Sequence, residues 1–215
     1  MRAIKAVLFE PVGCLAEFPA GPFNEIAADV FGFSADPGET GSEAYWQVLD
    51  LMTESGLKDA DRPVIERLEL QAIDGANVYE DVVPALEALR AMDITLLVAS
   101  SLSARAVHRF LDTSGVAAFF SGVWTRDNAG GIQAAPLQKA LASVGYQRDE
   151  VMVLVDTKEG LELVKDAGAN AILLINDYDE GRRLVAHAPA GAIVSLHELP
   201  DAIRFVADGT KASRP

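Results

Sequence analysis

A series of short apolar runs, separated by stretches with helical patterning, constrains the fold of this chain most strongly. Runs of this length are typical of strands that are buried on both faces. The runs span residues 4–9, 94–99, 151–155 and 171–175, followed by a shorter one at 192–194. Helical patterns occupy the intervals at 81–91, 103–113, 137–144, 160–167 and 199–206. This alternation predicts an α/β fold, in which a doubly wound parallel sheet has helices on both faces.

The segment between the first two runs has a different pattern. Apolar residues at i, i+3 and i+4 spacing form helical stripes that end at Gly32 and at Gly56, and Pro63 suits the first turn of a further helix. The pattern predicts a small all-helical domain at residues 18–78, inserted into a core of 1–17 and 79–215. Tyr45 and Trp46 are expected to pack inside it, because amphipathic helices bury their aromatic residues.

The patterning is weaker elsewhere in the second half of the chain. Residues 119–124 predict a short strand, and the Gly- and Ala-rich residues 127–136 predict a turn-rich loop. The acidic run 177–180 is interpreted as a solvated face.

Composition excludes several classes of function. The formal net charge is −14, with no cluster of Lys or Arg to offset it, which argues against nucleic acid and anionic membranes as partners. No apolar run reaches the roughly 18–20 residues of a membrane span. Cys14 is the only cysteine, so an intrachain disulfide cannot form, and the chain fits a reducing compartment. We therefore expect a soluble cytoplasmic protein.

Polar residues end the predicted strands at Glu10, Ser100 and Asp156. Strands often end in polar residues simply because loops are polar. In a doubly wound sheet, however, the carboxyl ends of neighbouring strands border one crevice, where such folds bind their ligands. The three side chains are therefore candidate site residues.

Together, these stretches resemble the haloacid dehalogenase superfamily, in the subgroup with a helical cap after the first strand. Residues 7–15 resemble its first motif, 96–100 its second, 119–136 its third and 153–168 its fourth. The resemblance implies a Rossmann-like core and a hydrolase active site at the strand ends.

The resemblance also implies roles for individual positions. Glu10 stands where the family has a nucleophilic aspartate, Val12 where its phosphatases have an acid/base aspartate, and Gln133 where it has a lysine. Ser100 matches the hydroxyl that binds phosphoryl oxygens, and Asp156 matches the Mg²⁺-binding aspartate. Glu10 and Asp156 are therefore the candidate ligands of a Mg²⁺ cofactor, which accepts one or two carboxylates and fills its remaining positions with water.

The departures from the family pattern carry physical costs. The extra methylene of Glu10 moves the carboxylate by roughly an ångström, and such a misplacement can cost about 10²-fold in rate. Val12 cannot transfer a proton, which typically costs about 10²–10⁴-fold. Gln133 carries no charge to neutralise a developing anion, and Pro11 removes a backbone N–H beside the carboxylate.

The leading hypothesis is a family member with a degenerate active site, serving a binding or regulatory role. The alternative is an active phosphatase or dehalogenase-like hydrolase that uses Glu10 in a rearranged site. The sequence names neither a small-molecule nor a protein partner, and a homodimer stays open.

Overall fold

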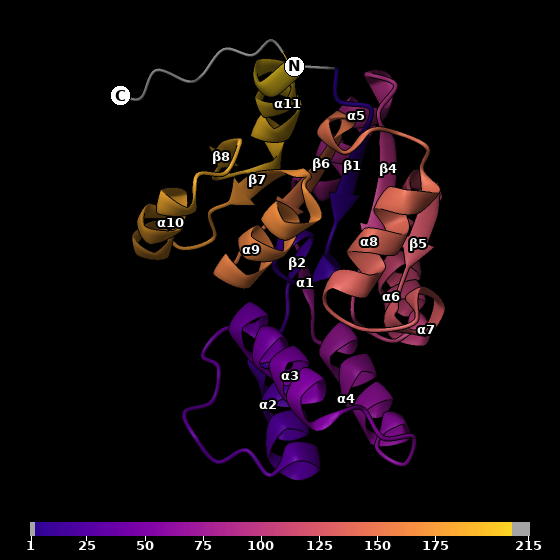
Figure 1. Ribbon diagram of the computed structural model, residues 1–215, viewed down its shortest axis with the longest axis vertical. Helices are drawn as coiled ribbons and strands as arrows, with labels where there is room; N and C mark the ends of the chain where they lie inside the picture. Colours follow the sequence, from indigo (N-terminus) through magenta and orange to yellow (C-terminus); the bar gives the residue numbers. More distant parts are fainter. Residues whose placement is uncertain (1–2, 208–215) are drawn as a thin grey trace.

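A parallel sheet forms the centre of the molecule in the computed structural model, which describes residues 3–207 (Figure 1). The sheet is six-stranded with the order β5-β4-β1-β6-β7-β8, and every neighbouring pair is parallel. The strands are β1 (Ala6–Phe9), β4 (Thr95–Ala99), β5 (Gly122–Trp124), β6 (Val151–Val155), β7 (Asn170–Leu174) and β8 (Gly191–Ile193). The chain progresses outward from β1 in one direction to β5, then returns to β6 on the other side of β1. This reversal confirms the doubly wound α/β fold and places β1 beside the crevice at the strand ends.

Helices cover both faces of the sheet, which explains why its strands are continuous apolar runs. In β1, Val7 and Phe9 pack into one core cluster, whereas Ala6 and Leu8 pack into a second cluster on the opposite face. One face is covered by α5 (Val82–Ala91), α6 (Ala104–Thr113) and α11 (Leu199–Ala207), and the other by α8 (Ala134–Ser143) and α9 (Lys158–Ala167). Within the described residues, no helix is both long and apolar enough to cross a membrane.

The segment between β1 and β4 forms a separate group of helices beyond one end of the sheet (Figure 1). It contains α2 (Ala20–Glu25), the π-helical turn η1 (Ile26–Val30), α3 (Gly41–Ser55) and α4 (Arg62–Asp74). A capping box of Thr40 and Glu43 begins α3, because each side chain accepts a hydrogen bond from the other's backbone. The short antiparallel strands β2 (Ala16–Glu17) and β3 (Asn77–Val78) pair at the base of this group. Domain boundaries at residues 18 and 78 stay a prediction.

The prediction of a loop at residues 127–136 is wrong, because this range is largely helical. It contains most of α7 (Arg126–Ala129), which ends at Gly130 in the left-handed conformation that glycine favours. It also contains the first turn of α8, where Pro136 is tolerated because N–H groups there have no intrahelical acceptor. Gly and Pro therefore mark helix ends here and not a continuous loop.

The other short elements are resolved as follows. The strand expected at 119–124 is confined to β5, because Ala117–Phe119 form a 3₁₀ turn. Pro11–Cys14 form one tight turn, α1, in which Val12 and Gly13 have non-helical backbone angles. The acidic run at 177–180 begins α10 (Tyr178–Leu184), and the Asp177 side chain caps it by accepting from the Glu180 N–H. Acids are favourable there because the first turn carries unpaired N–H groups.

We expect Leu8→Ala to lower the free energy of unfolding by about 2–5 kcal/mol, because it leaves a cavity in the central strand. Leu8 is 0% exposed. Urea denaturation measures the effect, and Val83→Ala, at a 39% exposed position, is the control. Equal stability losses in the two variants would contradict this account of the core.

Candidate functional site

Glu10 and Ser100 lie together at the carboxyl ends of β1 and β4. The Ser100 hydroxyl donates a 2.6 Å hydrogen bond to Glu10 Oε1. Both positions follow neighbouring parallel strands, so the pairing of β1 with β4 fixes their proximity. The structure therefore brings together the carboxyl and the hydroxyl that the sequence placed at separate strand ends.

Tyr45 completes the surroundings of Glu10 from the inserted helix α3. Its hydroxyl donates to Glu10 Oε2 at 3.0 Å and accepts from the backbone N–H of Ser101 at 2.9 Å. The side chain is 1% exposed. The sequence predicted only that Tyr45 packs, because a helical stripe reveals which residues are buried but not where a hydroxyl points. Both oxygens of the Glu10 carboxyl therefore accept a hydrogen bond.

Asp156 follows β6 and contacts a different part of α3. Its Oδ2 accepts from the Ser42 hydroxyl at 2.6 Å and from Asn176 Nδ2 at 3.5 Å. Ser42 and Tyr45 are three residues apart, so one face of α3 meets both candidate carboxyl groups. Neither Ser42 nor Asn176 was among the candidates chosen from the sequence.

Gly13 permits this close approach between the first loop and Asp156. Its φ of +74° is strained for other residues, and a Cβ there would lie 1.9 Å from Asp156 Oδ2 and 2.2 Å from Ser42 Oγ. The Gly13 carbonyl also accepts from Asn176 Nδ2 at 2.8 Å and from the Tyr79 hydroxyl at 3.3 Å. The loop after β1 is therefore tightly held against the end of β6.

The Gln133 side chain is directed toward α3 and not toward the Glu10 carboxyl. Its Nε2 donates to Asp50 Oδ1 at 2.8 Å, and its backbone N–H donates to Ser101 Oγ at 2.6 Å. Gln133 and Glu10 still line one small cavity. Gln133 therefore links Ser101, after β4, to Asp50 of α3. This is the residue at the position where the resemblance implies a lysine.

A buried ion pair connects the inserted helices to the sheet at a second place. Arg126 of α7 pairs with Glu69 of α4, and both side chains are only 3% exposed. Arg126 also donates to the Ser101 carbonyl at 3.1 Å, and Glu69 accepts from the Ser103 N–H at 3.1 Å. Removing one partner of such a pair by substitution leaves the other as an uncompensated buried charge, which is strongly destabilising. This pair has no local signature in the sequence, because its residues lie far apart and Arg126 adjoins the segment expected to be a loop.

The environment favours the neutral forms of both candidate carboxyl groups. Burial raises the pKa of Glu10 to about 8, although the hydrogen bonds from Ser100 and Tyr45 oppose the rise. Burial likewise raises the pKa of Asp156 to about 7, against the hydrogen bond from Ser42. A nucleophilic carboxylate must be ionised, so the closed arrangement disfavours that role for Glu10 near neutral pH.

The donor set does not fit Mg²⁺ in this arrangement. Mg²⁺ demands near-octahedral geometry and is commonly held by one or two carboxylates, with waters in its remaining positions. Both Glu10 oxygens and Asp156 Oδ2 are already engaged by the hydroxyl groups of Ser100, Tyr45 and Ser42. Within residues 3–207, no three His, Cys, Asp or Glu side chains are grouped closely enough to hold a metal ion.

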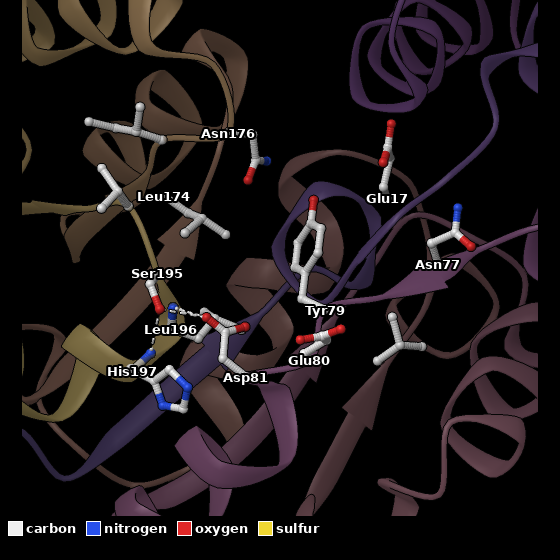
Figure 2. A pocket seen from close by; sticks show the side chains of 13 residues that line it. Glu17, Asn77, Tyr79, Glu80, Asp81, Leu174, Asn176, Ser195, Leu196 and His197 are labelled. Atoms are coloured by element: carbon white, nitrogen blue, oxygen red, sulfur yellow. Dashed lines mark hydrogen bonds between the residues drawn. The ribbon is translucent and has the colours of Figure 1, made fainter.

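A cleft and a neighbouring cavity lie beside Asp156 and Tyr79. A cleft of about 270 Å³ separates the α3 N-terminus from the sheet and is lined by Gly13, Ser42 and Asp156. Figure 2 shows the neighbouring cavity of about 530 Å³, where Asp81 accepts hydrogen bonds from the Ser195 hydroxyl and the Leu196 N–H. Tyr79 and Asn176 border both cavities. None of the candidate site residues lines the cavity in Figure 2, whereas Asp156 lines the 270 Å³ cleft.

Comparisons with known proteins agree with this architecture. The family model for haloacid dehalogenase-like hydrolases matches residues 38–174, which is more than half of the chain. The matched range contains Ser100, Gln133 and Asp156 but not Glu10. No curated protein sequence matches the chain.

Solved structures of low sequence identity share the fold. A predicted phosphatase from Clostridium acetobutylicum has a TM-score of 0.72 at 16% identity, covering 94% of this chain and 99% of that one. A phosphatase of the same superfamily from Thermococcus onnurineus has a TM-score of 0.63 at 21% identity, covering 92% and 97%. An L-2-haloacid dehalogenase from Xanthobacter autotrophicus, with chloropropionic acid covalently bound, has a TM-score of 0.63 at 15% identity, covering 94% and 98%.

We expect Tyr45→Phe to lower the free energy of unfolding by about 1–3 kcal/mol, because the Ser101 N–H loses its acceptor in a buried site. Chemical denaturation measures the change. Tyr178→Phe, at a 72% exposed position, is the matched control. A Tyr45→Phe protein as stable as the wild type would show that the hydroxyl contributes nothing to closure.

We also expect the free energy of unfolding to fall as pH rises from about 4.5 to about 8. Between the ordinary pKa of Glu10, 4.5, and its raised value of about 8, the folded state binds more protons than the unfolded state. The contribution of Glu10 to the free energy of unfolding is therefore fully present below pH 4.5 and is lost as pH rises through about 8. Glu10→Gln removes this contribution, on the order of a few kcal/mol.

Urea denaturation across this pH range tests the expectation. The wild type loses more stability than Glu10→Gln between the two pH limits. Parallel pH profiles for the two proteins would contradict a raised pKa for Glu10.

Proposed function

Because the chain belongs to the haloacid dehalogenase-like hydrolase family, we propose that it uses the family scaffold for a binding or regulatory role and lacks the family's usual nucleophilic turnover. The proposal concerns the strand-end site at Glu10, Ser100 and Asp156. The solved relatives include phosphatases and a dehalogenase, so both reactions are the ones to be tested.

The enclosure of Glu10 is the observation that carries this proposal. Ser100 and Tyr45 donate hydrogen bonds to its two oxygens, and Tyr45 brings its ring from α3 to the carboxyl. An attacking carboxylate needs an ionised oxygen directed at its substrate. Here the oxygens are directed at the protein's own hydroxyl groups, which supports a site that is closed on itself.

The neighbouring positions supply no replacement for the altered chemistry. Val12 is buried and has no proton to transfer. The Gln133 amide donates to Asp50, so it holds α3 in place instead of a substrate charge. Together with a carboxyl that burial keeps largely neutral, these changes support the loss of turnover.

An active hydrolase that uses Glu10 in a rearranged site is the second candidate. The observation in its favour is the 270 Å³ cleft, which leads from solvent to Asp156. For this function, α3 would have to withdraw Tyr45 and Ser42 from the two carboxyl groups. A cytoplasmic location and a homodimeric state stay predictions for either function.

Hydrolysis assays separate the two candidates. We expect purified protein to release neither phosphate from p-nitrophenyl phosphate in the presence of Mg²⁺ nor chloride from 2-chloropropionate above a protein-free background. The reason is that the Glu10 oxygens are enclosed and largely neutral. Phosphate and chloride release are measured directly.

Variants make the result decisive. Glu10→Ala tests the candidate nucleophile, and Glu87→Ala, which removes an exposed acid on α5, is the control. Turnover that is abolished by the first substitution and kept by the second would establish an active hydrolase and overturn the proposal.

A further inference from the structure

The cavity of about 530 Å³ in Figure 2 lies where the chain returns from the inserted helices to the sheet. Its volume is within the usual range of small-molecule sites, roughly 300–1,000 Å³. One wall comes from β3 and the residues that follow it, and another from the residues at the ends of β7 and β8. None of the strand-end residues Glu10, Ser100 and Asp156 lines it. It is therefore a candidate binding site separate from the strand-end site.

Several side-chain donors of this cavity are engaged by the protein itself. The Tyr79 hydroxyl and Asn176 Nδ2 both donate to one backbone carbonyl in the loop after β1, at 3.3 and 2.8 Å. The Ser195 hydroxyl donates to Asp81 Oδ2 at 2.7 Å. The Asn77 amide extends away from the Tyr79 ring (Figure 2). Few donors around Tyr79 are therefore left for a ligand.

The acceptors of the cavity, by contrast, are largely free. Glu17 and Glu80 accept no hydrogen bond within residues 3–207 and form no ion pair there. Asp81 Oδ1 and Asn176 Oδ1 also accept none from the described residues, because these two side chains make their contacts through Oδ2 and Nδ2. No Lys or Arg lines the cavity, and His197 is the one basic residue in its lining. A ligand suited to this lining must donate hydrogen bonds and carry no negative charge.

Apolar surface accompanies these acceptors. Val78 is 38% exposed and Val194 is 62% exposed, and both line the cavity together with Leu174. Exposed apolar side chains that share one hollow provide a surface that an apolar part of a ligand can cover. The lining therefore favours a ligand that has methylene groups as well as donors.

The Tyr79 ring separates the acceptors into two groups (Figure 2). Asn176 and Glu17 lie toward its hydroxyl, whereas Glu80 and Asp81 lie at the base of the ring. An aromatic face attracts organic cations through its ring quadrupole. A ligand that lies along this ring would meet one group of acceptors at each of its ends.

The carboxylates of this cavity do not form a metal site. Within residues 3–207, no three His, Cys, Asp or Glu side chains lie close enough together to hold a metal ion. An ammonium group needs no such cage, because it is a positive charge with three donors and no acceptor. Two ammonium groups joined by methylenes match both groups of acceptors and the apolar surface between them.

From these observations we infer that the cavity binds a linear aliphatic diamine in its doubly protonated form. One ammonium group donates to Glu80 and Asp81, and the other donates to Asn176 Oδ1 on the side of Glu17. The methylene groups between them lie along the Tyr79 ring and the exposed valines. The inference goes beyond the proposed function, because it assigns a ligand class to a second cavity that the strand-end residues do not line.

Titration of the ¹⁵N-labelled protein with 1,4-diaminobutane, followed through its backbone amide resonances, tests this inference. We expect saturable shifts confined to residues 77–81, 174–176 and 194–197, with a dissociation constant on the order of 1 mM, which a ligand of a few atoms allows. Salt at about 0.15 M screens general attraction to a chain of net charge −14. Two compounds of similar length are the controls: 1,4-butanediol lacks the charges and succinate reverses them, and neither is expected to bind.

Variants at exposed positions assign the contacts. Glu80→Gln is expected to weaken diamine binding about fivefold, the upper range for a solvent-accessible ion pair, whereas Glu87→Gln, the same change on α5 outside the cavity, leaves it unchanged. Val194→Lys places a cation in the cavity and is expected to abolish saturable binding. Its control is Val64→Lys on α4, a 39% exposed position outside the cavity. Amide spectra of the free variants verify that each is folded.

Specific results would overturn the inference. Shifts that spread over the acidic surface and grow without saturation would show general electrostatic attraction and no site. Equal binding of 1,4-butanediol, or undiminished diamine binding by Val194→Lys, would equally refute it. The hydrolysis assays are independent of this titration, since they concern Glu10, so the failure of either proposal leaves the other standing.

Discussion

The hydroxyl of Tyr45 is the interaction on which the arrangement of the site depends. It donates to Glu10 and accepts from the Ser101 N–H, so one group from α3 satisfies a side chain after β1 and a backbone after β4. These partners belong to elements that the sheet already holds together. The position of α3 is therefore set by the strand ends themselves and not only by the apolar packing of its own helical group.

The other contacts of α3 and α4 follow from this closure. Ser42, one turn before Tyr45, meets Asp156, and Asp50 further along the helix meets Gln133. Glu69 of α4 forms its buried pair with Arg126, whose guanidinium also donates to the Ser101 carbonyl. The Ser101 N–H thus donates directly to α3, and its carbonyl is linked to α4 through Arg126. Opening the site requires these polar groups to separate together, which favours a single closed state.

The sequence was sufficient for the scaffold because burial on both faces leaves a local signal. The runs at 94–99 and 151–155 coincide with β4 and β6 within a residue. Glu10, Ser100 and Asp156 follow neighbouring strands at one edge of the sheet, where Ser100 donates a hydrogen bond to Glu10. Their partners were not predictable in the same way. Tyr45, Ser42 and Glu69 lie on amphipathic helices, where periodicity identifies the buried face but does not specify which atom of the sheet a polar group will reach. Partners of this kind are fixed by tertiary packing alone.

The identity of residue 10 has a physical explanation in this context. An aspartate is one methylene shorter, so its carboxyl would stand roughly an ångström further back from α3, a displacement large enough to break a hydrogen bond. The longer Glu10 side chain spans that gap and meets Ser100 at 2.6 Å and Tyr45 at 3.0 Å. Glutamate and tyrosine therefore act as a matched pair across the crevice. The longer side chain therefore gives the sheet a carboxyl that holds the inserted helix through a contact inside the protein.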